Sequence, residues 1–123
     1  MSEPQVDPDA ALLELRDALR RFAAARDWDQ FHSPKNLAAA LSVEAAELLE
    51  HFQWRTEADS SHLDAATRDA VALEMADVLL YLIRLGDKLD VDLIAAARHK
   101  LELNARKYPV DKSKGSSRKY DAL

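Results

Sequence analysis

Residues that break helices are few in this chain, and they stand at the boundaries of its segments. Only two glycines and four prolines occur among 123 residues, whereas alanine, leucine, glutamate, lysine and arginine dominate. Asp7-Pro8 and Ser33-Pro34 each combine a capping residue with a first-turn proline, which is typical of a helix start. No segment shows the convincing alternation of a strand. These features predict an all-α fold.

Apolar segments separated by polar breaks predict four helices, over residues 8–26, 34–53, 65–88 and 93–107. We expect one helical domain over 8–109, preceded by a flexible arm over 1–7 and followed by a basic tail over 110–123. The second and third helices are apolar around most of their circumference, which is more surface than a four-helix monomer covers. Alanine-rich helices can look hydrophobic without such contacts, but the pattern favours an oligomer.

Composition excludes several classes of protein. The chain has no cysteine, which excludes disulfides and thiolate metal sites and favours the cytoplasm. No apolar run reaches the roughly 18 residues of a membrane span, and the first residues lack the pattern of a signal peptide. A net charge of -5 argues against general binding of nucleic acid. We therefore expect a cytoplasmic protein with no membrane or nucleic-acid partner.

Two pairs of carboxylates at helical i, i+3 spacing lie inside the second and third helices. Glu44 pairs with Glu47, and Glu74 pairs with Asp77. Residues three apart share a helix face, so each pair presents two carboxylates to one point. Carboxylates withdrawn from water need a partner, a proton or a metal ion. If the two helices pack antiparallel, the pairs converge on an all-oxygen site that suits Mg²⁺ or Mn²⁺.

A di-iron carboxylate bundle is the rival metal site. It requires Glu-x-x-His repeats, and no histidine here has that spacing after a glutamate, since His51 follows Glu47 by four residues. A single acidic pair is often only a solvated helix face, but two pairs on consecutive apolar helices favour a metal site. Glu50 continues the first stripe, either as a further ligand or as a solvent-facing side chain.

Aromatic and basic residues near the helix ends are candidates for binding a substrate. Trp28 and Trp54 follow the first two helices, where a pair of indoles either sandwiches a planar base or plugs the ends of the bundle. Tyr81, one turn after Asp77, either contacts a substrate or only packs. Candidate phosphate contacts, which also suit a helix C-terminus or a solvated tail, are Asn104, Lys107, Arg118 and Lys119.

The order of the two acidic pairs resembles the MazG-like nucleoside triphosphate pyrophosphohydrolases, and the flanking blocks resemble the dCTP pyrophosphatase branch. The resemblance covers about residues 12–121. It implies a Mg²⁺-dependent hydrolase that converts a nucleoside triphosphate and water to the monophosphate and pyrophosphate, a reaction of nucleotide-pool sanitation. The blocks that carry it are 26–32, 34–36, 52–54, 77–81, 104–109 and 116–120.

The resemblance also implies roles for individual residues. Glu44, Glu47, Glu74 and Asp77 would hold the metal ion, and one of the first pair would orient the attacking water. Relatives assemble as dimers of dimers, which implies a homotetramer built from four-helix MazG-like units. The implied substrate-binding residues are Trp28, Asp29, Gln30, Phe31, His32, Trp54, Tyr81, Asn104, Lys107, Arg118 and Lys119.

The preferred base stays open in the sequence. Leu19 stands where vertebrate relatives have a histidine, so dUTP or another non-canonical triphosphate is an alternative to dCTP or a modified dCTP. A non-catalytic helical module that oligomerises through the same apolar faces is a second alternative, and it predicts no metal dependence.

Overall fold

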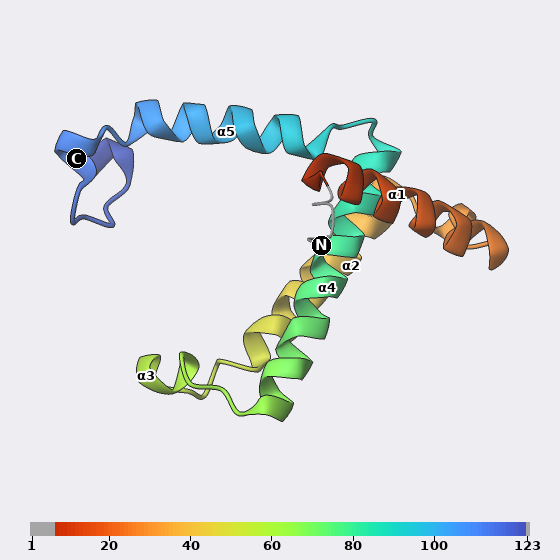
Figure 1. The fold of residues 1–123 in the computed structure, drawn as a ribbon, viewed down its shortest axis with the longest axis horizontal. Coiled ribbons are helices and arrows are strands. Elements are labelled where there is room, and N and C mark those ends of the chain that lie inside the picture. Colours follow the sequence, from red (N-terminus) through yellow and green to blue (C-terminus); the bar gives the residue numbers. More distant parts are fainter. Residues whose placement is uncertain (1–6, 123) are drawn as a thin grey trace, which may run out of the picture. The chain divides into compact units, whose positions relative to one another are not determined.

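The computed structural model describes residues 7–122, and within that range it contains helices and no strand. The all-α prediction is confirmed (Figure 1). The long helices are α1 (Pro8–Ala25), α2 (Pro34–Glu50), α4 (Ala65–Lys88) and α5 (Leu93–Lys107). The short elements are α3 (Glu57–Ser60), α6 (Val110–Ser113) and the 3-10 turns Asp29–Phe31 and Tyr120–Ala122.

Local chemistry sets the helix boundaries. The Ser33 hydroxyl caps α2 by accepting a hydrogen bond from the backbone N–H of Asn36 at 3.2 Å. The chain leaves α1 through Asp27, whose φ of 53° lies in the left-handed region that aspartate tolerates better than most residues. The second helix ends at Glu50 rather than at 53, because the following turn tightens and the N–H of Phe52 donates to the carbonyl of Leu49.

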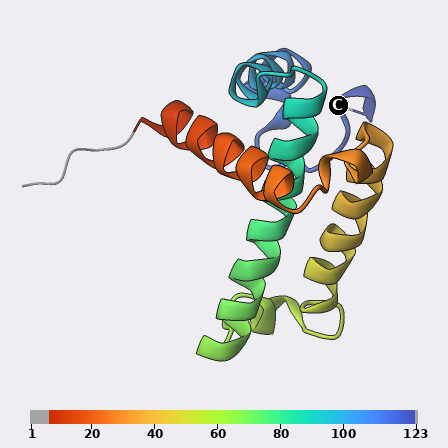
Figure 2. The same cartoon turned by 90° about the vertical axis from the view of Figure 1, so that its right-hand side faces the viewer.

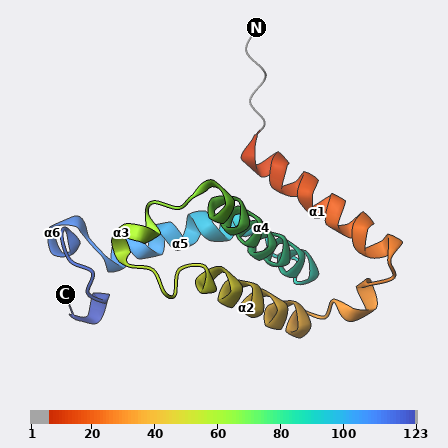
Figure 3. The ribbon, with the colours of Figure 1, turned by 90° about the horizontal axis from the view of Figure 1, so that it is seen from below.

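The chain divides into two compact units, one ending at Asp90 and the other beginning at Val91. In the first unit, α2 and α4 run antiparallel side by side (Figures 1 and 3), and α1 packs across α4 (Figure 2). The second unit holds α5, α6 and the last turn. There, the rings of Tyr108 and Tyr120 meet edge to face with centroids 6.3 Å apart. A bundle that combines all four long helices therefore stays a prediction.

The first unit buries few side chains completely. Its buried apolar residues, among those described, are Ala23, Leu37, Val71 and Ile83. Many larger apolar side chains on α2 and α4 remain exposed in the single chain, Leu73 with 70% of its surface. None of the described helices is long and apolar enough to cross a bilayer. The predicted arm lies outside the described residues except for Asp7, and the predicted domain limits at 8 and 109 stay predictions.

Candidate active site

Three of the four predicted acids meet between α2 and α4. Glu44 comes from α2, whereas Glu74 and Asp77 come from α4, and one carboxylate oxygen of each lies within 4.8 Å of the others. The Oε2 atoms of Glu44 and Glu74 are buried and have no hydrogen-bond partner among the described residues. Antiparallel packing of the two helices produces this convergence (Figure 1).

The surroundings of Glu44 raise its pKa from 4.5 to about 7. The largest cause is a side-chain hydrogen bond with Glu74, which forms only when one of the two carboxyls carries a proton. Burial and the neighbouring carboxylates of Glu47 and Asp77 raise the pKa further. Near neutral pH, the cluster therefore holds either a shared proton or an uncompensated charge, and a cation relieves both.

Glu47 lies at the edge of this cluster. It is not one of the three residues with mutually close oxygens, but its side chain interacts with Glu44 through a hydrogen bond and through its charge. The ligand atoms that the cluster offers are all carboxylate oxygens. Glu44 and Glu74 each bury an oxygen that has no partner among the described residues, which is costly unless a cation is bound. The cluster therefore fits a divalent metal ion.

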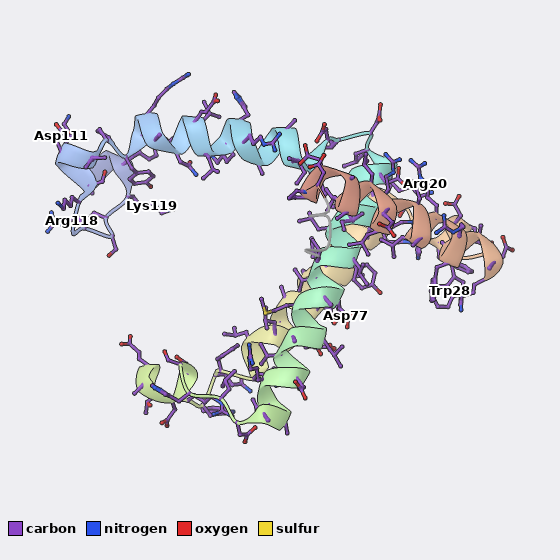
Figure 4. All side chains as sticks on the ribbon, viewed as in Figure 1. Arg20, Trp28, Asp77, Asp111, Arg118 and Lys119 are labelled. Atoms are coloured by element: carbon purple, nitrogen blue, oxygen red, sulfur yellow. The ribbon has the colours of Figure 1, made fainter. Side chains whose placement is uncertain are left out.

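A pocket of about 420 Å³ adjoins the acidic cluster through Asp77. Four of the predicted site residues, Trp28, His32, Asp77 and Tyr81, line this pocket together. Figure 4 shows Trp28 beyond the end of α1 and Asp77 on α4. The remaining wall is mostly apolar and comes from Leu15, Ala18, Leu19, Phe22, Ala23, Leu80 and Arg84. An apolar pocket with a few convergent polar groups is the usual form of a small-ligand site.

Aromatic rings form one side of the pocket. The centroids of Phe22 and Trp28 are 5.6 Å apart, and those of Trp28 and His32 are 6.5 Å apart, both edge to face. Such rings offer flat faces against which a planar base can stack. Phe22 was missed in the sequence, although its position one turn after Leu19 on α1 pointed to this wall.

Trp54 does not join Trp28 within one chain. Trp28 precedes the start of α2 and Trp54 follows its end, and a helix of 17 residues spans about 25 Å. The Trp54 side chain is 90% exposed. A single chain therefore does not sandwich a base between the two indoles.

Arg84, which the sequence interpretation missed, holds the segment around Asp29 and His32 against α4. Only 6% of Arg84 is exposed. Its Nη2 donates to Asp29 Oδ1 at 2.7 Å, and its Nε donates to His32 Nδ1 at 3.2 Å. Lys88 Nζ pairs with the same Asp29 oxygen, and this bond, ahead of the charge of Arg84, lowers the pKa of Asp29.

A signal for Arg84 was present in the sequence. Asp77, Tyr81, Arg84 and Lys88 follow one another at spacings of three or four, so they lie along one face of α4. Following this face of α4 beyond Tyr81 would have found the two basic residues, Arg84 and Lys88.

Gln30 and Phe31, also predicted as substrate contacts, are not among the residues that line the pocket. Gln30 donates through Nε2 to the carbonyl and carboxylate of Asp27, and Phe31 is exposed. The four remaining candidates, Asn104, Lys107, Arg118 and Lys119, belong to the second unit. There, Lys107 Nζ lies 5.0 Å from the centroid of the Tyr120 ring, and Arg118 and Lys119 stand on the segment after α6 (Figure 4). Their contact with phosphates stays a prediction.

Fold and site together define a class: an all-α protein that presents a carboxylate cluster fitted to a divalent metal ion beside an aromatic-lined pocket for a small ligand. Comparison with known proteins names the class. The chain belongs to the MazG-like family, whose model matches residues 39–123. The resemblance seen in the sequence is thereby confirmed.

Characterised relatives agree with this assignment. dCTP pyrophosphatase 1 of Homo sapiens is 42% identical over 118 residues, which cover 94% of this chain and 69% of the human protein, and that of Rattus norvegicus matches to the same extent. A crystal structure of a pyrophosphatase from Archaeoglobus fulgidus has a TM-score of 0.77 and 40% identity, covering 89% of this chain and 99% of that one. The chain is a dCTP diphosphatase-like hydrolase, which sets aside a purely non-catalytic module.

Proposed function

We propose that this protein is a Mg²⁺-dependent nucleoside triphosphate pyrophosphohydrolase that acts on dCTP or a modified dCTP. The observation that carries the proposal is the carboxylate cluster of Glu44, Glu74 and Asp77, with two partnerless buried oxygens, directly beside the pocket of Trp28 and Tyr81. Relatives named dCTP pyrophosphatase 1 and a structural neighbour named a pyrophosphatase support it.

The reaction joins the two parts of the site. Water attacks the α-phosphorus, the bond from that phosphorus to the bridging oxygen breaks, and pyrophosphate leaves while the monophosphate remains. Glu44, Glu47, Glu74 and Asp77 would hold Mg²⁺, or Mn²⁺ in its place. The bound cation supplies positive charge that offsets both the carboxylates and the triphosphate oxygens. Glu44 or Glu47 orients the water and takes up its proton.

The pocket binds the nucleoside in this proposal. The ring of Trp28 stacks on the base, and Tyr81 contacts the substrate from α4. Asp77 belongs to both the pocket and the cluster, so a nucleoside in the pocket has its α-phosphate next to the carboxylates. Because the segment around Trp28 is anchored through Asp29, the pocket wall is held in place before the substrate binds.

We propose further that the protein assembles as a homotetramer, a dimer of dimers. Large apolar side chains on α2 and α4, Leu49, Leu73 and Met75 among them, are exposed in the single chain, and few residues are fully buried. Burial of such residues against another copy is favourable. Trp54, exposed and distant from the pocket of its own chain, then contributes to the site of a neighbouring copy. Asn104, Lys107, Arg118 and Lys119 are proposed to meet the phosphates.

The proposed setting is the cytoplasmic nucleotide pool, with a free nucleotide rather than a nucleic acid as the partner. A panel of nucleoside triphosphates tests this function. Pyrophosphate release is measured with and without Mg²⁺ for dCTP, 5-methyl-dCTP, dUTP and the common ribonucleotides. We expect Mg²⁺-dependent release that is fastest with the cytosine nucleotides. Fastest release from dUTP would show that the enzyme prefers dUTP to the cytosine nucleotides. No release of pyrophosphate from any nucleotide would refute the function.

A further inference from the structure

His32 lines the pocket, and one of its ring nitrogens is already committed. Its Nδ1 lies 3.2 Å from Nε of Arg84. A guanidinium N–H can only donate a hydrogen bond, so Nδ1 must accept it and carries no proton. A neutral imidazole then holds its proton on Nε2. The contact with Arg84 therefore selects one tautomer of His32.

The surroundings of His32 keep the ring neutral. Burial lowers its pKa most, and the positive charges of Arg84 and Lys88 lower it further, against the opposing charge of Asp29. At neutral pH, the ring therefore has one donor and one acceptor, and the acceptor is in use.

Arg84 is itself held in one orientation. Beyond His32, it donates to Asp29 at 2.7 Å and lies 3.6 Å from Asp87. Asp87 is in turn fixed by Nε of Arg20 at 2.7 Å. A buried guanidinium with partners on two sides has little freedom to release the histidine, so the tautomer is built into the fold.

The second nitrogen of the ring remains available. His32 Nε2 makes no hydrogen bond to any residue in the range that the structure describes, while the ring lines the pocket beside Trp28. A pyrimidine that stacks on Trp28 carries acceptors on its edge, at the carbonyl oxygen O2 and, in cytosine, at N3. A donor at fixed position beside a stacked base can distinguish an acceptor from a donor on that edge.

We propose that Arg84 is a positioning residue that holds His32 in its Nε2–H form, and that this N–H is the donor with which the pocket reads an acceptor on the pyrimidine edge. The inference rests on the proposed function, because it requires a nucleotide base in the pocket. It assigns base recognition to His32 and gives Arg84 a role that is more than structural.

The tautomer can be observed directly. Nitrogen-15 NMR of the labelled histidine in the intact protein is expected to show a protonated Nε2 and an unprotonated Nδ1 for His32. In Arg84→Met, His32 is expected to lose its preference for the Nε2–H tautomer and to populate the Nδ1–H tautomer as well. Lys88→Met is the matched control, because it removes a partner of the same Asp29 oxygen without touching the ring, and it should leave the tautomer unchanged. A protonated Nδ1 in the unmodified protein would overturn the inference without any use of activity.

Recognition of the base is tested with variants of His32, because this test does not require Arg84→Met to fold. Substrates are dCTP and the abasic 2-deoxyribose 5′-triphosphate, which has no edge to read. We expect His32→Leu to lower kcat/KM for dCTP about tenfold, mainly by raising KM. The same substitution should leave kcat/KM for the abasic triphosphate unchanged. The amide N–H of His32→Gln can take the place of Nε2–H, so this variant is expected to keep most of the kcat/KM for dCTP that His32→Leu loses.

The outcomes separate this inference from the proposed function. Equal losses for both substrates in His32→Leu would show that the ring only supports the pocket, and the inference would be wrong while hydrolysis stands. Absence of hydrolysis of any triphosphate by the unmodified protein would instead refute the proposed function itself.

Discussion

Glu44 links metal binding to pH through a single carboxyl. Its pKa is raised to about 7, first by the hydrogen bond with Glu74 and then by burial and by Glu47 and Asp77. As the pH rises through this value, the metal-free protein loses the proton and the cluster gains a charge that a cation can neutralise. The affinity for Mg²⁺ is therefore predicted to rise between about pH 6 and about pH 8.

Calorimetric titration with Mg²⁺ in two buffers of different ionisation enthalpy measures this coupling. At pH 7, binding should release a fraction of a proton, and Glu44→Gln should abolish the release. A proton balance of zero in the unmodified protein would show that Glu44 is not part of the metal site.

Glu47 is the residue whose role the geometry leaves to experiment. It stands beside Glu44 at the edge of the cluster, where it can hold the cation or orient water. We predict that Glu47→Gln lowers kcat for dCTP by about 100-fold or more, because loss of a positioned base or ligand has effects of that order. Helical content and assembly should not change. Glu14→Gln on the exposed face of α1 is the control, and retained turnover in Glu47→Gln would remove this residue from the site.

At this scale, local spacing could be predicted and distant pairing could not. The acidic pairs were visible because i, i+3 positions share a helix face whatever the tertiary structure. Arg84 has its partners Asp29 and His32 at separations of 55 and 52 residues. The helix face that carries Asp77 and Tyr81 could point to Arg84, but no local pattern specifies such pairs, so the partners of Arg84 appeared only in the structure.

Among the elements, α1 and α4 are linked by a well-formed ion pair. Arg20 on α1 donates through Nε to Asp87 on α4 at 2.7 Å, and this bond is the main cause of the lowered pKa of Asp87. We predict that Arg20→Met lowers the free energy of unfolding slightly at neutral pH, since the arginine half of the pair is exposed to solvent.

The pH dependence of this effect has a definite sign. A carboxyl with a lowered pKa stabilises the fold above its unfolded pKa, and the contribution is lost as the pH falls through the folded value. Urea unfolding of Arg20→Met and of the neighbouring control Arg21→Met should therefore differ at pH 7 and converge in acid. Equal stability of the two variants at pH 7 would contradict the prediction.

The start of a helix was predictable where the sequence has an N-terminal capping residue. Ser33-Pro34 fixes the start of α2, and Asp64 caps α4 by accepting from the N–H of Thr67 at 2.7 Å. The helix α3 was missed because four residues carry no periodic pattern, although Thr56 caps it. How α1 crosses α4 depends on side chains from distant parts of the chain, which periodicity does not encode.

For the whole molecule, the exposed apolar surface of α2 and α4 is the feature that a single chain leaves unexplained. We predict that the protein sediments as a tetramer, with four times the 13.8 kDa of one chain. Leu73→Glu places a charge on this surface, where the single chain exposes 70% of the residue. The variant should therefore sediment with a lower mass than the unmodified protein while its helical content is retained. Sedimentation of the unmodified protein as a 13.8 kDa monomer would refute the assembly.

The helical class of the molecule could be predicted from composition, because so few residues interrupt its helices. Its division after Asp90 could not be predicted, since it depends on contacts that form only in the folded protein. The apolar faces of the second and third helices favoured an oligomer, which stays a prediction. The family resemblance supplied the chemistry that spacing alone did not.

The central claim, hydrolysis at the α-phosphorus, is tested most directly by isotope labelling. The protein is incubated with dCTP and Mg²⁺ in water enriched in oxygen-18, and the products are analysed by mass spectrometry. We predict dCMP and pyrophosphate, with one labelled oxygen in dCMP and none in pyrophosphate. Formation of dCDP and inorganic phosphate, a label in pyrophosphate, or no hydrolysis at all would contradict the claim.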